Sequence, residues 1–115
     1  MRVLHALGIG FTLLAAAACS SNPTTTANSC GSSGANANVN TTSSNTFSPA
    51  SVTITHGQSV CWQSGNVLHT VTDNGGAFDA DLPVGQVFVH TYPAAGTYPY
   101  HCKIHAAMTG TVIVS

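Results

Sequence analysis

The sequence predicts an all-β domain of the sandwich type. From Ala35 onward, short alternating or β-branched runs are separated by Gly, Pro, Asn and Asp, which is typical of strands joined by turns. No apolar pattern of helical period continues for more than a turn or two. About seven or eight strands fit into residues 35–115, and so many short strands favour two sheets packed face to face.

The expected strands follow one another closely along the chain. In the first, Ala35, Ala37 and Val39 alternate with Asn. The remaining runs are 51–55, 59–63, 67–72, 86–92, 97–102 and 109–115. Side chains alternate between the two faces of a strand, so Val60 and Trp62 share what we expect to be the core face, and the cysteine between them takes the other.

Residues 1–18 predict a secretory signal peptide. Arg2 precedes an apolar run of 13 residues, 6–18, which is too short to span a membrane. The run AAAC that ends at Cys19 resembles the lipobox of bacterial lipoproteins, in which the chain is cut before a cysteine that then receives a lipid. We expect a lipid on Cys19; the alternative is ordinary cleavage that leaves a plain thiol. Residues 19–34 are mostly Ser, Thr, Asn and Gly and predict a flexible tether.

Cleavage after residue 18 leaves 97 of the 115 residues, enough for one small domain, residues 35–115. Its charged side chains are Lys103, Asp73, Asp79 and Asp81, a net charge of −2 with neutral histidines. There is no basic stretch, which argues against a nucleic-acid partner.

The four cysteines predict both a disulfide and a metal site. An exported domain usually pairs its cysteines, and we expect Cys30 to bond to Cys61; two free thiols are the alternative. If Cys19 carries a lipid, Cys102 is left over. An unpaired thiol in an oxidising compartment is a liability unless something occupies it, and a metal ion is the obvious occupant.

The neighbours of Cys102 indicate which metal. The stretch YHCKIHAAM places Cys102, His105 and Met108 three residues apart. A thiolate, imidazoles and a thioether together favour copper, because structural zinc sites use Cys and His without a methionine sulfur. Two histidines, one cysteine and a weak axial methionine form the blue-copper set, and His69, at the start of a strand after a turn, is the best candidate for the second histidine.

Each ligand taken alone has another explanation. Met108 could fill the core, Cys102 could be a small buried apolar residue, and the two histidines could be surface residues. Only the four together make a metal site the better interpretation. We expect three other histidines not to bind the metal. His56 lies in a turn and His90 in the middle of a strand, so both are structural or solvent-facing. His101 points away from the neighbouring cysteine by strand alternation.

The segments FSPASVTITHGQSVCWQSGNVLHTVT and AAGTYPYHCKIHAAMTGTVIVS resemble cupredoxins of the plastocyanin, pseudoazurin and amicyanin group. The resemblance covers residues 47–115 and is carried by C-x-x-H-x-x-M-x-G-x-V near the C-terminus. It implies a Greek-key sandwich with one copper ion near one end. The implied ligands are His69, Cys102, His105 and Met108.

One position departs from the family pattern. Thr70 stands where the family commonly carries Asn, whose side chain ties the two ligand loops together and whose amide points at the cysteine sulfur. The backbone amide of Thr70 can still reach the sulfur, but the sequence does not predict the tie between the loops.

These observations predict an exported blue copper protein that carries one electron at a time. A site filled by four protein ligands leaves no position for a substrate, so we expect no enzymatic activity. The alternative is a periplasmic module for copper storage or delivery. We expect a monomer in the periplasm or at the cell surface, anchored by the lipid on Cys19, with a redox protein in or near the same membrane as its partner.

Overall fold

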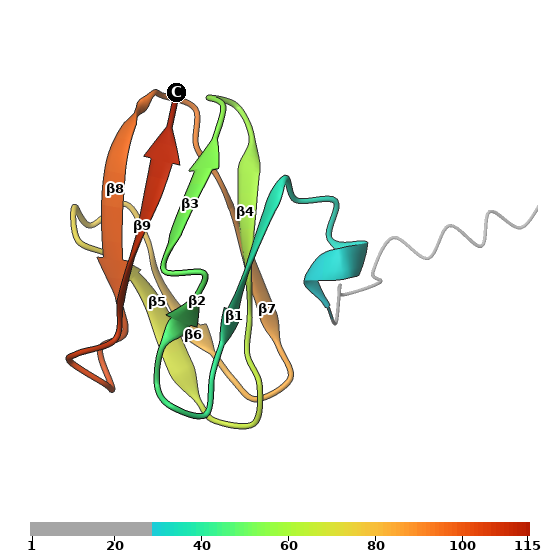
Figure 1. Ribbon diagram of the computed structural model, residues 1–115, viewed down its shortest axis with the longest axis vertical. Helices are drawn as coiled ribbons and strands as arrows, with labels where there is room; N and C mark the ends of the chain where they lie inside the picture. Colours follow the sequence, from blue (N-terminus) through green and yellow to red (C-terminus); the bar gives the residue numbers. More distant parts are fainter. Residues whose placement is uncertain (1–28) are drawn as a thin grey trace, which may run out of the picture.

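The computed structural model describes residues 29–115, which form a sandwich of two β-sheets (Figure 1). The expected signal peptide, most of the expected tether and Cys19 lie outside the described residues. No helix in the described part of the chain is long and apolar enough to cross a membrane.

Nine strands and one short 3-10 helix make up the domain. In chain order these are η1 (Cys30–Ser32), β1 (Ala37–Thr41), β2 (Phe47–Ser48), β3 (Ser51–Ile54), β4 (Ser59–Gln63), β5 (His69–Asp73), β6 (Asp79–Leu82), β7 (Val87–Thr91), β8 (Gly96–His101) and β9 (Thr109–Val114). The predicted all-β sandwich is confirmed, with one or two strands more than expected. Both strands without a predicted counterpart, β2 and β6, carry weak signals, since β2 has two residues and β6 reads DADL.

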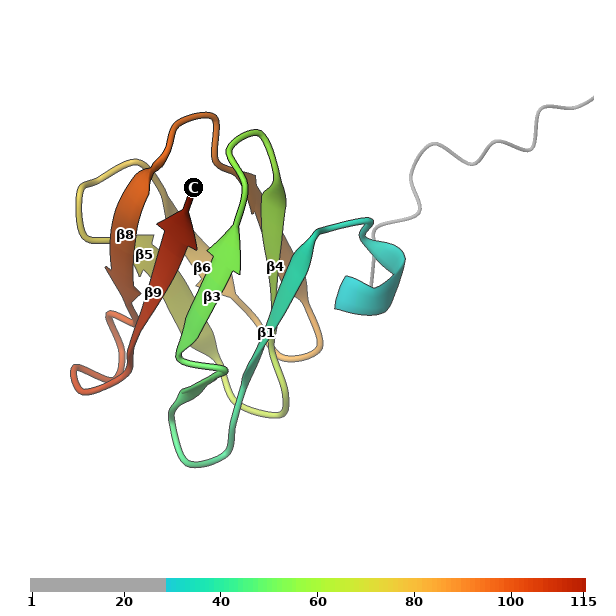
Figure 2. The same ribbon diagram turned by 45° about the horizontal axis from the view of Figure 1, so that its top comes forward.

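The strands divide between the two layers in an order that differs from the chain order. One sheet has the order β2-β1-β4-β7, and the other has the order β3-β9-β8-β5-β6. The pairs β1–β4 and β3–β9 are parallel, and all other pairs in these sheets are antiparallel. The chain therefore crosses repeatedly between the layers, as the two views show (Figures 1 and 2).

The core lies between the sheets and is built from alternate residues of the strands. Val60 and Trp62 of β4 are fully buried and belong to the core cluster, as their spacing predicts. Trp62 packs edge-on against Tyr100 of β8 and stacks on Phe88 of β7, with ring centroids 5.3 and 5.7 Å apart. Large aromatic rings from both layers thus hold the sheets together.

Cys61 points away from this core and is bonded to Cys30, with their Cα atoms 5.6 Å apart. The backbone N–H of Cys30 also donates a hydrogen bond to Gln63 Oε1 at 3.0 Å. The η1 turn therefore lies beside the sheet that contains β4 (Figures 1 and 2). Because the bridge spans 31 residues of sequence, it restrains the unfolded chain by about 3 to 4 kcal/mol on the loop-entropy model.

His90 of β7 has a structural position, as the sequence indicates. Its half-buried ring packs against Phe78 and Tyr92, with centroids 4.4 and 4.7 Å apart. Burial lowers the pKa of His90, although nearby Asp73 opposes the shift. The ring is therefore neutral at pH 7 and belongs to the aromatic packing between the layers.

Gly110 of β9 makes room for a core side chain of the neighbouring strand. Tyr100 is directly opposite Gly110 in the register of β8 with β9, and its ring lies across the glycine. A Cβ atom at position 110 would overlap Cζ and the hydroxyl oxygen of Tyr100. The glycine of the C-terminal motif is thus explained by packing.

We expect Gly110→Ala to destabilise the domain by about 1 to 3 kcal/mol, because the buried Tyr100 ring cannot move aside freely. Denaturant unfolding followed by Trp62 fluorescence measures the change. Gly31→Ala is the matched control, since the nearest atom to its added Cβ is Ser29 Oγ at 3.8 Å. Equal unfolding midpoints for the two variants would show that Tyr100 does not need the space above Gly110.

Candidate metal centre

Two segments meet at the end of the sandwich opposite the C-terminus (Figure 1). His69 is the first residue of β5, and Cys102 and His105 lie in the loop between β8 and β9. The antiparallel pairing of β5 with β8 sets Thr72 opposite His101, so the start of β5 lies beside the loop that leaves β8. Two segments more than thirty residues apart in sequence are therefore neighbours.

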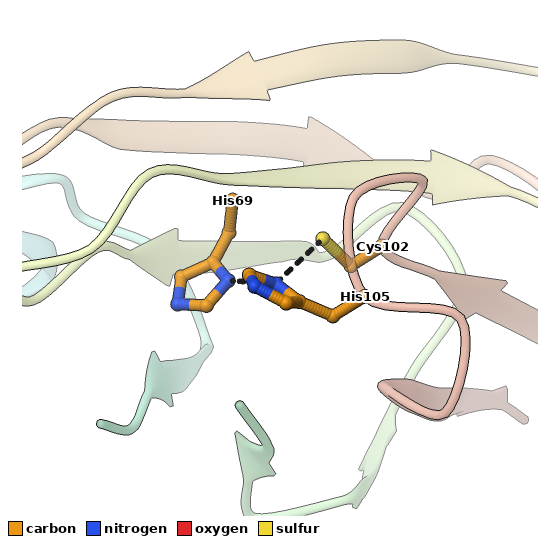
Figure 3. A group of neighbouring side chains, drawn as sticks. All are labelled: His69, Cys102 and His105. Carbon is orange, nitrogen blue, oxygen red and sulfur yellow. Dashed lines mark hydrogen bonds between the residues drawn. The ribbon is translucent and has the colours of Figure 1, made fainter. Parts of the chain in front are cut away.

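The side chains of His69, Cys102 and His105 converge on one point (Figure 3). Each offers one donor atom, and the donor atoms all lie within 4.8 Å of one another. The Nδ1 atom of His105 is 3.2 Å from His69 Nδ1 and 3.8 Å from Cys102 Sγ. Donors about 2.0 to 2.3 Å from a shared ion lie about 3.3 to 3.8 Å apart at tetrahedral or trigonal angles. The nitrogen–sulfur distance falls in this range and the nitrogen–nitrogen distance is just below it, so small side-chain movements would let these donors share one metal ion.

The three donors differ in their access to solvent. His69 and Cys102 are buried, whereas His105 is partly exposed. Burial, together with the charge that His105 would carry, lowers the pKa of His69. His69 is therefore neutral at pH 7, the form of imidazole that binds a metal ion.

Met108 closes the loop that carries two of the donors. Its N–H donates to the carbonyl of His105 at 2.9 Å, and its carbonyl accepts from the N–H of Cys102 at 3.0 Å. Its side chain is buried and belongs to the same core cluster as Cys102. All four residues predicted from the sequence thus lie at this end of the domain, in a cluster consistent with one copper ion.

Thr70 makes the tie between the ligand loops that its residue type did not predict. Its backbone N–H donates to Cys102 Sγ at 3.3 Å. Its hydroxyl oxygen accepts a hydrogen bond of 2.8 Å from the N–H of Lys103, the residue after the cysteine. A threonine hydroxyl can thus replace an asparagine amide here, and a polar side chain next to His69 was the only signal for it in the sequence.

The other histidines of residues 29–115 lie outside the cluster. His56 is exposed in the turn after β3, and His90 belongs to the aromatic packing. His101 is half-exposed, and its Nδ1 lies 2.5 Å from Asn74 Oδ1. Among these residues Cys102 is the only free cysteine, since Cys30 and Cys61 form the disulfide.

The sandwich with this cluster at one end is a cupredoxin-like fold. It is similar to a purple cupredoxin from Nitrosopumilus maritimus, with 26% identity, a TM-score of 0.62 and coverage of 69% of this chain and 99% of that one. It is also similar to amicyanin from Paracoccus versutus, with 29% identity, a TM-score of 0.62 and coverage of 72% and 83%. No family model and no curated protein sequence matches the chain.

Proposed function

We propose that this protein is an exported type 1 copper protein that carries one electron at a time between redox partners. The observation that carries the proposal is the convergence of a buried cysteine sulfur and two imidazole nitrogens beside Met108. His69, Cys102, His105 and Met108 would hold one copper ion. When bound, copper supplies one-electron chemistry by exchanging between Cu(I) and Cu(II).

The donor set favours copper over zinc. Thiolate and thioether sulfurs are soft ligands that suit Cu(I), and imidazole suits both oxidation states. The similar solved structures support this choice, since they include mutants of amicyanin in a reduced state, in an oxidised state and in a reduced Cu(I) form. The purple cupredoxin and amicyanin share this fold with the chain.

The geometry favours a carrier over an enzyme. Four protein donors would fill the coordination sphere of a bound ion, whereas a catalytic metal site keeps one position for water or substrate. His69 and Cys102 are buried, so the partly exposed His105 is the donor nearest to a partner. Electron transfer would require only that a redox partner come close to the exposed part of His105.

The surface beside His105 suits a brief, weakly charged encounter. Leu68 and Ile104 are about half exposed and each precedes one of the two histidines in sequence. Ala106 and Ala107, also exposed, extend this apolar surface. Lys103 is paired with Asp79 at 2.6 Å, so the site presents no free cation among the described residues. Small apolar patches of this kind fit transient redox contacts.

The N-terminal sequence supports a membrane-anchored form with a partner close to the same membrane. If Cys19 carries a lipid, ten residues separate it from Cys30, which the disulfide fixes to β4. Ten residues extend to at most about 35 Å, so the copper domain would remain near the membrane surface. A respiratory complex or another anchored carrier would be within reach.

We expect the oxidised protein to show an intense visible band from charge transfer between the Cys102 thiolate and copper. Cys102→Ser should abolish the band, because serine does not supply the thiolate. Visible absorption of the Cu(II)-loaded proteins measures it. The double variant Cys30→Ser, Cys61→Ser is the control and should keep the band. A colourless wild-type protein with bound Cu(II) would contradict the copper–thiolate assignment.

Met108 should adjust the reduction potential more than the affinity for copper. Met108→Leu should keep the visible band and raise the potential, because loss of a weak axial donor disfavours Cu(II). Met108→Gln, which offers an oxygen donor, should shift the potential in the opposite direction. Protein-film voltammetry of the three proteins checks both directions. A Met108→Leu variant that fails to retain copper would show that Met108 is needed to form the site.

The association rate with the redox partner should depend little on ionic strength. With Lys103 paired to Asp79 and Asp73 buried, few free charges remain to steer the approach. Stopped-flow mixing between about 0.02 and 0.5 M salt should change the rate by less than about three-fold, since screening acts mainly on free surface charges. A steep dependence that disappears in Asp81→Asn would instead assign steering to that carboxylate.

Cys19→Ser should release the domain from membranes while preserving its colour. At matched protein amounts, isolated membranes should then reduce or oxidise the released domain more slowly than the anchored protein. The control is Ser20→Ala, which changes the neighbouring residue and keeps Cys19. Equal exchange rates for anchored and released protein would place the partner away from the membrane.

A further inference from the structure

We propose that a closed ring of hydrogen bonds holds the Thr70 amide against the Cys102 sulfur and thereby tunes the metal centre. The ring links the segment that contains His69 to the segment that contains Cys102, and none of its members is a candidate metal ligand. Its members are Thr70, Thr72, Asp79 and Lys103. The inference rests on the proposed copper site for its effect on potential, but the ring itself can be tested without metal.

In every contact of the ring, the donor and acceptor atoms lie within hydrogen-bonding distance. The N–H of Lys103 donates to Thr70 Oγ1 at 2.8 Å. Thr70 Oγ1 and Thr72 Oγ1 are 3.1 Å apart, and Thr72 donates to Asp79 Oδ1 at 2.9 Å. The second oxygen of Asp79 lies 2.6 Å from Lys103 Nζ, so the path returns to the residue from which it started.

The chemistry of the groups fixes the direction of each hydrogen bond, so that both arms of the ring start at Lys103 and end at Asp79. A hydroxyl carries one hydrogen, and Thr72 uses its own to bond Asp79. Thr70 must therefore donate to Thr72, while its lone pair accepts from Lys103. A carboxylate only accepts, so Asp79 ends the chain of hydroxyls and also receives the ammonium group of Lys103. Hydrogen bonds that run in one direction polarise and strengthen one another.

The Asp79–Lys103 ion pair closes the ring and is not an isolated surface contact. Both side chains are about half exposed, at 52% and 48%, and an exposed pair by itself contributes little to stability. Lys103 is the only Lys or Arg among residues 29–115, yet its backbone and its side chain both join the ring. The pair thus fixes the carboxylate that orients both hydroxyls.

The ring affects the metal centre through two neighbours of the ligands. Thr70 follows His69, and Lys103 follows Cys102, so the ring holds the backbone of both ligand segments. The Thr70 N–H that it holds donates to Cys102 Sγ at 3.3 Å. A hydrogen bond to the sulfur stabilises negative charge on it, and this favours the reduced form, in which the thiolate carries more charge. The ring residues are therefore positioning residues.

The test removes one hydroxyl from the ring without touching a ligand. Thr72→Val keeps the shape of the side chain and removes its hydroxyl, whereas the control Thr72→Ser keeps the hydroxyl and removes a methyl group. In metal-free protein, amide hydrogen exchange of Thr70 and Lys103, measured by NMR, should accelerate about three- to ten-fold in Thr72→Val, the loss expected for one hydrogen bond. Exchange in Thr72→Ser should remain at the wild-type rate.

The copper-loaded proteins provide the second readout. Thr72→Val should have a lower reduction potential and a visible band at longer wavelength, since a weaker N–H···S bond raises the energy of the sulfur electrons. Thr72→Ser should match the wild-type protein in both. Faster exchange with an unchanged potential and band would show that the ring only stabilises the fold, and wild-type exchange rates in Thr72→Val would show that no ring holds the amides; either result overturns the proposal. A wild-type protein without a visible band would overturn the proposed function, while the exchange rates would still decide whether the ring exists.

Discussion

The pairing of β5 with β8 is the constraint on which the metal centre depends. Thr72 lies opposite His101 and Asp73 opposite Tyr100, and this register sets the start of β5 beside the loop after β8. A shift by one residue would move every side chain of β5 to the other face of the sheet. The buried Val71 and the buried Tyr100 hold the register, because their positions in the core suit only one alignment. The strands thus fix where His69 meets Cys102.

The loop after β8 then needs little further ordering. It spans only a few residues, and backbone hydrogen bonds from Cys102 to Met108 and from Met108 to His105 close it. The Thr70 hydroxyl and amide hold the loop to β5 at Lys103 and Cys102. A loop so connected holds its donors close together without a metal ion, which would reduce the cost of reorganisation between the oxidation states of the proposed copper ion.

The two sheets of the sandwich carry different features. All candidate donors come from β5 and from the loop between β8 and β9, which belong to one sheet. The disulfide joins the N-terminal segment to β4 of the other sheet. Tension on the N-terminal segment would therefore act on the layer that carries no donor, and the aromatic core around Trp62 separates it from the site. This separation is compatible with the proposed tethered carrier, whose metal site would need to stay rigid.

The sequence by itself determined the sandwich class, the core face of β4 and the residue types of the site. Alternation of apolar residues identifies strands because each strand buries one face, and C-x-x-H-x-x-M concentrates soft donors within one loop. Only the tertiary structure decided that β6 is a strand, since its Asp residues disfavour one until β5 pairs with it. It also decided the role of Thr70, because the partners Thr72, Asp79 and Lys103 are spread over more than thirty residues and meet only when three strands align. Local patterns record burial and ligand chemistry, whereas a hydrogen-bonded ring between distant residues depends on strand register, which no local pattern contains.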